Sequence, residues 1–214
     1  VHLDDSFAVP GIGTVVAGLV VSGDVQTKDE LLLGPDGNGA FLPVVVKSCQ
    51  NKRVAVDRVA CGSTGSFALK LARGGGSKGH HHLLKQDVRK GMILCATSLQ
   101  PRACWRFKAE VVILSHPTTL KVGYAPILHC LTVRQCARIV SMEEGRVDVL
   151  RMGDRATVTF EWNHRPEFMK VGSRVIFREG RTKGVGVVRE VNPDVPRTPP
   201  TNYKSLRSQQ SRPQ

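Results

Sequence analysis

Residues 177–188 read FREGRTKGVGVV, and this stretch separates two kinds of fold. A phosphate-binding loop needs Gly, four residues and then Gly-Lys-Ser/Thr, so that consecutive backbone N–H groups surround a phosphate. Here Lys183 precedes Gly184 and no hydroxyl follows it. A dinucleotide fingerprint opens a helix, whereas the residues after Gly186 alternate as in a strand. The stretch is therefore predicted to be a strand, a glycine-bearing turn and a second strand.

Short β-branched or alternating runs recur along the rest of the chain, separated by Gly, Pro and Asp clusters. They lie at residues 14–21, 42–46, 65–69, 107–114, 156–160 and 174–177. The sequence PDGNG at 35–39 is a strong turn signal, because Gly and Asn accept positive φ angles. Helix signals are weak, and one turn is expected near 86–90. The pattern predicts an all-β chain with two antiparallel β-barrels in tandem, each of about six or seven strands.

The domain boundary is expected at residues 98–102, where Ser-Leu-Gln-Pro-Arg interrupts the strand pattern. The first barrel would then span 1–98 and the second 103–192. Residues 193–214 are rich in Pro, Ser and Gln and are predicted to form a disordered tail. Residues 73–82 combine glycines with three histidines, and we expect a solvated insertion there rather than a metal site, because a flexible loop does not hold ligands in fixed directions.

The positive charge of the chain indicates a polyanionic partner. Lys and Arg total 31 against 18 acidic residues, which gives a net charge of +13. Residues 1–98 contribute +3, residues 99–192 contribute +7 and the remainder +3. Such a balance is typical of proteins that bind nucleic acid or an acidic membrane face, and the alternative is a protein that is merely basic.

The sequence offers few candidates for catalysis. Six cysteines are scattered without a Cys-x-x-Cys pair, which favours buried reduced thiols in a cytosolic protein. There is no Gly-x-Ser-x-Gly elbow and no His-Glu-x-x-His zinc helix. Residues 51–54 begin like the guanine-reading Asn-Lys-x-Asp but end in Val54. No run is long enough for a membrane helix. We therefore predict no catalytic residue and no metal site in this chain.

Three segments carry a resemblance to a known family. Residues 9–18, VPGIGTVVAG, resemble the opening of the second domain of elongation factor Tu and elongation factor 1-alpha. Residues 107–126 are similar to the third domain of the eukaryotic factor, and residues 178–188 match its last hairpin. Within the superfamily, segments such as Arg89-Lys90-Gly91-Met92 look most like GTP-binding proteins 1 and 2.

The resemblance implies the second and third domains of a translational GTPase. A GTPase domain would precede Val1 and would hold GTP and Mg²⁺, while this part would contain no cofactor. Implied partners are tRNA or other RNA, the ribosome and the protein's own GTPase domain, in the cytoplasm. The family's functions concern aminoacyl-tRNA handling, ribosome-associated GTP hydrolysis and mRNA turnover. A scaffold that docks RNA-decay machinery is the alternative, and salt dependence distinguishes phosphate binding from apolar docking.

The resemblance also implies two sets of site residues. Asp4, Asp5 and Phe7 take positions that bind the aminoacyl end of tRNA, where an aromatic ring beside carboxylates suits a stacked base and an ammonium group. The alternative places Phe7 in the core. Arg165, Gly180 and Arg181 take positions that contact the RNA backbone. The alternative is a set of solvated surface charges.

Overall fold

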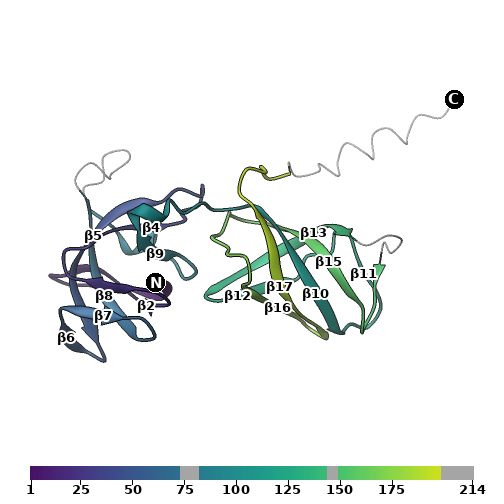
Figure 1. Ribbon diagram of the computed structural model, residues 1–214, viewed down its shortest axis with the longest axis horizontal. Helices are drawn as coiled ribbons and strands as arrows, with labels where there is room; N and C mark the ends of the chain where they lie inside the picture. The colour runs from purple at the N-terminus through teal and green to yellow at the C-terminus, as the bar shows by residue number, and fades with distance from the viewer. Residues whose placement is uncertain (73–81, 144–148, 199–214) are drawn as a thin grey trace.

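The computed structural model describes residues 1–72, 82–143 and 149–198, which form two antiparallel β-barrels in tandem (Figure 1). Helical structure in these ranges is confined to two short 3-10 turns, η1 (Lys85–Asp87) and η2 (Thr97–Leu99). The all-β prediction is confirmed, and the turn expected near 86–90 corresponds to η1. The insertion predicted at 73–82 lies outside the described residues except for its last histidine, as do residues 199–214 of the predicted tail.

Six strands close the first barrel in the order β4-β9-β1-β2-β8-β5, and β5 pairs with β4. Their bounds are β1 His2–Val9, β2 Gly13–Leu19, β4 Glu30–Gly34, β5 Leu42–Asn51, β8 Thr64–Leu71 and β9 Ile93–Ala96. A short strand, β6 (Val54–Val56), extends the sheet beside β5, and β3 (Asp24–Gln26) pairs with β7 (Arg58–Ala60). The core of the first barrel consists of inward-facing apolar side chains, among them Leu3, Val16, Val44, Phe67 and Leu69.

The second barrel also closes with six strands, in the order β10-β15-β13-β12-β16-β17, since β17 pairs with β10. Their bounds are β10 Arg106–Ser115, β12 Ile127–Cys130, β13 Val133–Glu143, β15 Arg155–Trp162, β16 Arg174–Glu179 and β17 Thr182–Asn192. Outside the barrel, β11 (Leu120–Lys121) pairs with β14 (Val149–Leu150). The predicted runs at 107–114, 156–160 and 174–177 fall within β10, β15 and β16.

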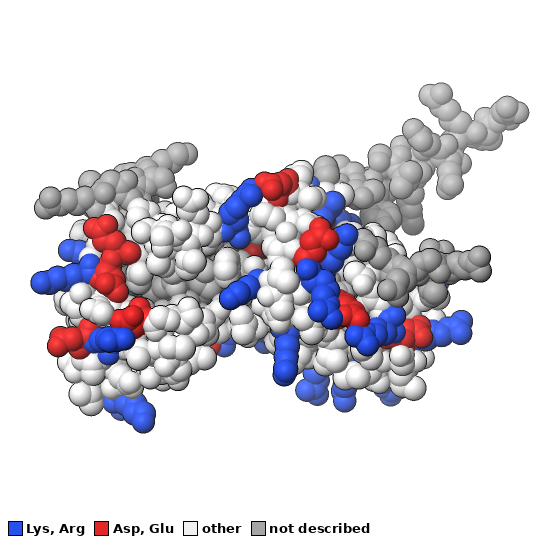
Figure 2. Space-filling view, viewed as in Figure 1, with Lys and Arg blue, Asp and Glu red and all other residues white. Residues whose placement is uncertain are grey.

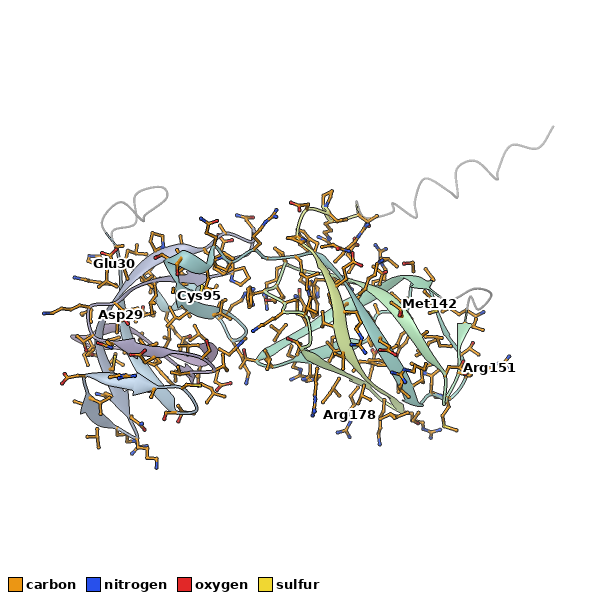
Figure 3. The ribbon with its side chains drawn as sticks, viewed as in Figure 1. Asp29, Glu30, Cys95, Met142, Arg151 and Arg178 are labelled. Atoms are coloured by element: carbon orange, nitrogen blue, oxygen red, sulfur yellow. The ribbon has the colours of Figure 1, made fainter. Side chains whose placement is uncertain are left out.

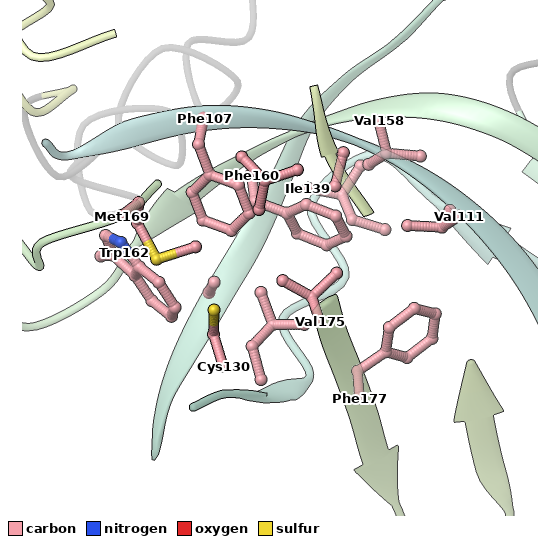
Figure 4. Close-up of a cluster of buried hydrophobic side chains, with 14 of the residues drawn as sticks. Phe107, Val111, Cys130, Ile139, Val158, Phe160, Trp162, Met169, Val175 and Phe177 are labelled. Carbon is pink, nitrogen blue, oxygen red and sulfur yellow. The ribbon is translucent and has the colours of Figure 1, made fainter. Parts of the chain in front are cut away.

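Aromatic side chains fill the core of the second barrel (Figure 4), and close packing in this barrel requires glycine at two positions. The ring of Phe107 lies 5.6 Å from that of Phe160 and 5.1 Å from that of Trp162, measured between centroids. A Cβ on Gly184 would lie 2.0 Å from the ring of Phe177, and a Cβ on Gly186 would lie 2.5 Å from a backbone oxygen of β10. These glycines therefore make room for core packing and do not form a phosphate loop.

The two barrels approach each other closely at two glycines of the first barrel. The last strand of the first barrel ends at Ala96 and the first strand of the second begins at Arg106. A Cβ on Gly39 would lie 3.1 Å from Pro166, and a Cβ on Gly91 would lie 3.3 Å from the Cα of Val133. The boundaries 1–98 and 103–192 stay predictions, although the strands of each barrel fall within those limits.

Candidate functional site

Strand β1 holds Asp4, Asp5 and Phe7 on its exposed side. Leu3 pairs with Gly18 and Asp5 pairs with Ala17, so that Asp4 is an extra residue in a β-bulge. Strict alternation from the buried Leu3 would turn Asp5 and Phe7 inward. The bulge reverses this phase, and Phe7 is 46% exposed. The core position considered for Phe7 is therefore excluded, and the ring and both carboxylates are accessible to a ligand.

A groove of about 530 Å³ lies next to this strand, at the end of the first barrel beside the β1–β2 turn. Its apolar walls include Val9, Ile12 and Leu83, and three lysines, at positions 47, 70 and 85, contribute to its rim. Thr14 Oγ1 donates a hydrogen bond to the Leu83 carbonyl at 2.7 Å and holds the wall in place. This groove could not be predicted from the sequence, because it forms from segments about 70 residues apart.

The turn between β16 and β17 presents Gly180 and Arg181. Glu179 pairs with Thr182, which leaves these two as the central residues of the turn. Gly180 has a φ of +55°, as a type II′ turn requires at its first central position. The predicted strand, turn and strand are thus confirmed. Both residues are exposed, and no atom would obstruct a Cβ on Gly180 within 4 Å.

Like charges face each other beside this turn. Arg178 is directly opposite Lys183 in the β16–β17 register, and both are exposed. Opposed like charges weaken a strand pair, and none of Arg178, Arg181 and Lys183 forms an ion pair with a described residue. Figure 2 shows basic side chains along the lower edge of the second barrel, where Figure 3 labels Arg178. The tip of the hairpin thus carries three cations against the single carboxylate of Glu179, which leaves it with an excess of positive charge.

Two side chains outside the hairpin anchor the turn. The hydroxyl of Tyr124 donates to Glu179 Oε2 at 3.1 Å, and His116 Nδ1 lies 2.7 Å from the Thr182 hydroxyl. The acidic residue next to the turn is thus directed toward Tyr124. The role of Tyr124 could not be predicted from the sequence, because nothing local links residues 124 and 179.

Arg165 lies elsewhere on the second barrel, beside the first barrel. Gln135 of β13 fixes its backbone, accepting from the Arg165 N–H at 2.9 Å and donating to its carbonyl at 3.1 Å. In the sheet order, β12 separates β13 from β16. The structure therefore brings Gly180 and Arg181 together but does not bring Arg165 into contact with them. The predicted backbone-contacting residues form two separate places on one barrel.

Glu167 is the centre of a charged network between the barrels that sequence reasoning missed. Its side chain is 1% exposed. Arg89 of the first barrel donates to both carboxylate oxygens, at 3.0 and 2.9 Å, and also to the Pro35 carbonyl at 3.1 Å. Burial raises the pKa of Glu167 and lowers that of Arg89, so that each charge depends on the other. The pair ties the two barrels together.

A second buried carboxylate, Glu161, binds side chains from neighbouring strands. Arg106 of β10 and Arg138 of β13 are its cross-strand partners, with N–O distances of 2.6 and 2.8 Å. Thr198 donates its N–H and its hydroxyl to Glu161, at 3.0 and 2.7 Å. Burial alone raises the pKa of Glu161, but these hydrogen bonds outweigh it and lower the pKa to about 2. The described start of the predicted tail, residues 193–198, thus contacts the barrel.

The residues present do not fit a nucleotide or a metal. Among residues 1–72, 82–143 and 149–198 there is no group of three or more His, Cys, Asp and Glu side chains placed to hold a metal ion. The sequence lacks a phosphate-binding loop and the complete guanine-reading motif. In the same ranges, no helix is long and apolar enough to cross a membrane.

The chain is similar in sequence to known translation factors and GTP-binding proteins. Residues 100–192 match the family of elongation factor Tu C-terminal domains. The chain is 41% identical over 190 residues to GTP-binding protein 1 of Xenopus laevis, which covers 89% of the chain and 27% of that protein. It is 36% identical to human GTP-binding protein 2, covering 89% of the chain and 29% of that protein. Elongation factor 1-alpha of Staphylothermus marinus is 27% identical over 210 residues, covering 90% of the chain and 44% of that protein. The chain thus spans about a quarter of the length of the GTP-binding proteins it matches.

Proposed function

Since this chain belongs to the elongation factor-like GTP-binding proteins, we propose that its two barrels bind aminoacyl-tRNA or another RNA, together with the ribosome, in the cytoplasm. In the whole protein, a GTPase domain that uses GTP and Mg²⁺ would act with them, and the barrels would transmit its state to the bound RNA. The sequence contains no phosphate-binding loop, and no step of GTP hydrolysis is assigned to the residues of this chain.

The observation that carries the proposal is the excess of positive charge at the tip of the β16–β17 hairpin. Arg178 and Lys183 repel each other across the strands, and Arg181 adds a third charge in the turn. A phosphate group between them would relieve that repulsion. Arginine offers a planar fork to phosphate oxygens and needs no particular base, which suits a protein that binds many tRNAs. The bare backbone at Gly180 allows an RNA strand to approach closely.

The aminoacyl end of the tRNA would lie on the first barrel, at Asp4, Asp5 and Phe7. The bulge turns the Phe7 ring outward, where a terminal base can stack on it. A free amino group on the attached amino acid would carry a positive charge next to the two carboxylates. This arrangement favours binding of aminoacylated tRNA over tRNA without an attached amino acid.

A salt titration with labelled tRNA tests the proposal. Replacing both Arg165 and Arg181 by Ala should weaken binding of every tRNA alike and reduce the slope of log affinity against log salt by roughly one to two. Lys52→Gly with Arg53→Gly is a matched control, because it removes two exposed charges from the β5–β6 turn of the first barrel, where both residues have positive φ. Equal affinities and slopes in the two double variants, with the fold intact, would refute the proposal.

A protein-docking function is the second candidate, and an apolar strip on the same barrel favours it. Ile176, 52% exposed, lies opposite Val185 on the outer face of β16 and β17, in a groove of about 440 Å³. Outward positions of a barrel in water are usually polar. Binding of a purified RNA-decay protein would then change little between about 50 and 200 mM salt. The affinity for that protein should decrease in the Ile176→Ser variant. If either result is not obtained, the docking alternative is excluded.

A further inference from the structure

Two guanidinium groups from opposite barrels share the carboxylate of Glu167. Arg89 comes from the segment before β9 of the first barrel, and Arg165 follows β15 of the second. Gln135 Nε2 adds a hydrogen bond to Oε1 at 3.0 Å. One negative charge thus faces two positive charges, and the junction retains one surplus cation.

The two arginines contribute unequally. Arg89 binds both oxygens through its two terminal nitrogens, whereas Arg165 reaches Oε1 only through Nε, at 3.3 Å. The terminal nitrogens of Arg165 have no hydrogen-bond partner among the described residues, and its side chain is 39% exposed. The fork of Arg165 is therefore open to solvent, while that of Arg89 is occupied.

We propose that Arg89 is a positioning residue for Arg165, which it frees to bind a phosphate of the RNA. The inference rests on the proposed function, because it concerns the use of Arg165. The carboxylate of Glu167 is 1% exposed and needs a cation that binds it directly, because a buried charge without a partner destabilises the fold. Arg89 meets that need from the first barrel. Without it, Arg165 is the remaining cation within reach and turns inward onto Glu167.

The position of Arg89 depends in turn on how the barrels meet. Its guanidinium is held by the Pro35 carbonyl, and the neighbouring Gly91 lies against Val133 of the second barrel. Gln135 holds the Arg165 backbone in place whichever way the side chain points. RNA affinity at Arg165 is thereby linked to the contact between the two barrels.

The test compares tRNA affinity and salt slope in four variants. Arg165→Ala should weaken binding about tenfold and reduce the slope by about one. Arg89→Ala should produce the same two changes, although Arg89 touches no RNA. Combining both substitutions should cause no further loss beyond Arg165→Ala. Arg89→Ala with Glu167→Gln should restore affinity and slope, because the amide no longer demands a cation. Lys90→Ala, which removes an exposed charge next to Arg89, is the matched control.

Thermal unfolding of each variant separates positioning from folding. If Arg89→Ala lowers affinity only as far as it lowers stability, and Glu167→Gln restores nothing, the inference is wrong and Arg89 is purely structural. If Arg165→Ala weakens binding but Arg89→Ala does not, the inference fails while the proposed function stands. If Arg165→Ala itself changes nothing, the role of Arg165 in RNA binding falls, and the inference with it.

Discussion

Protonation of Glu161 at low pH should lower the free energy of unfolding of the second barrel. The contribution of this one carboxylate can be isolated by comparison with the Glu161→Gln variant. The pKa of Glu161 is about 2 in the folded protein against an ordinary value of 4.5. A depressed pKa means that the carboxylate stabilises the fold fully above pH 4.5 and that this contribution is lost as the pH falls toward 2. The affected window is therefore about pH 4.5 to 2.

The size of the effect follows from the same two values. Their difference corresponds to about 3.4 kcal/mol at most. The side chains of Arg106 and Arg138 are 27% and 35% exposed, so solvent screens part of the attraction. We therefore expect a loss of about 2 kcal/mol from this carboxylate.

Tryptophan fluorescence in urea is a selective assay, because both tryptophans of the chain, Trp105 and Trp162, lie in the second barrel. Unfolding midpoints would be measured between pH 5.5 and about 2.5 for the two proteins. The variant starts less stable at pH 5.5, and the two curves should converge as the pH falls. Parallel curves across the whole window would show that Glu161 is not the titrating group and would refute the reasoning.

Three further predictions concern the core, the first barrel and the nucleotide. Gly184→Ala should destabilise the second barrel by about 1–3 kcal/mol in urea unfolding, because the new Cβ would overlap the Phe177 ring, and wild-type stability would contradict the packing described. Phe7→Ala should leave stability within about 1 kcal/mol, since the ring is half exposed, but should reduce discrimination between charged and uncharged tRNA; undiminished discrimination would remove Phe7 from the site. Labelled GTP should not be retained in filter binding by the chain at micromolar concentration, and stoichiometric retention would overturn the assignment of its domains.

The strands and the hairpin were predictable because their signals are local. β-branched alternation marked β10, β15 and β16, and the glycines of 177–188 excluded a phosphate loop through their spacing. Strand ends differ by at most two residues from the predicted runs, except that β5 continues five residues beyond its run, because hydrogen bonding in the ladder sets the ends. Local sequence patterns were therefore sufficient to predict the fold class.

The charged networks were not predictable, because they depend on register between distant segments. Arg89 and Glu167 are 78 residues apart, and Arg106 and Glu161 are 55 apart. Nothing in the neighbourhood of either glutamate indicates a buried carboxylate with partners. The residues alone left Phe7 open between the binding site and the core for a related reason, since one extra residue in a strand reverses the inward and outward sides after it.

The direct contact of backbone with side chain at the barrel junction makes the spacing between barrels sensitive to a single methyl group. Gly39 and Gly91 both have positive φ, and a Cβ at these places would lie 3.1 Å from Pro166 and 3.3 Å from Val133, so that the neighbour would have to move by a few tenths of an ångström. An alanine at either place would strain its backbone and crowd the contact between the barrels. On the proposed function, a tRNA that contacts Phe7 on one barrel and Arg165 on the other depends on the separation of these two residues, so substitution of either glycine should weaken tRNA binding.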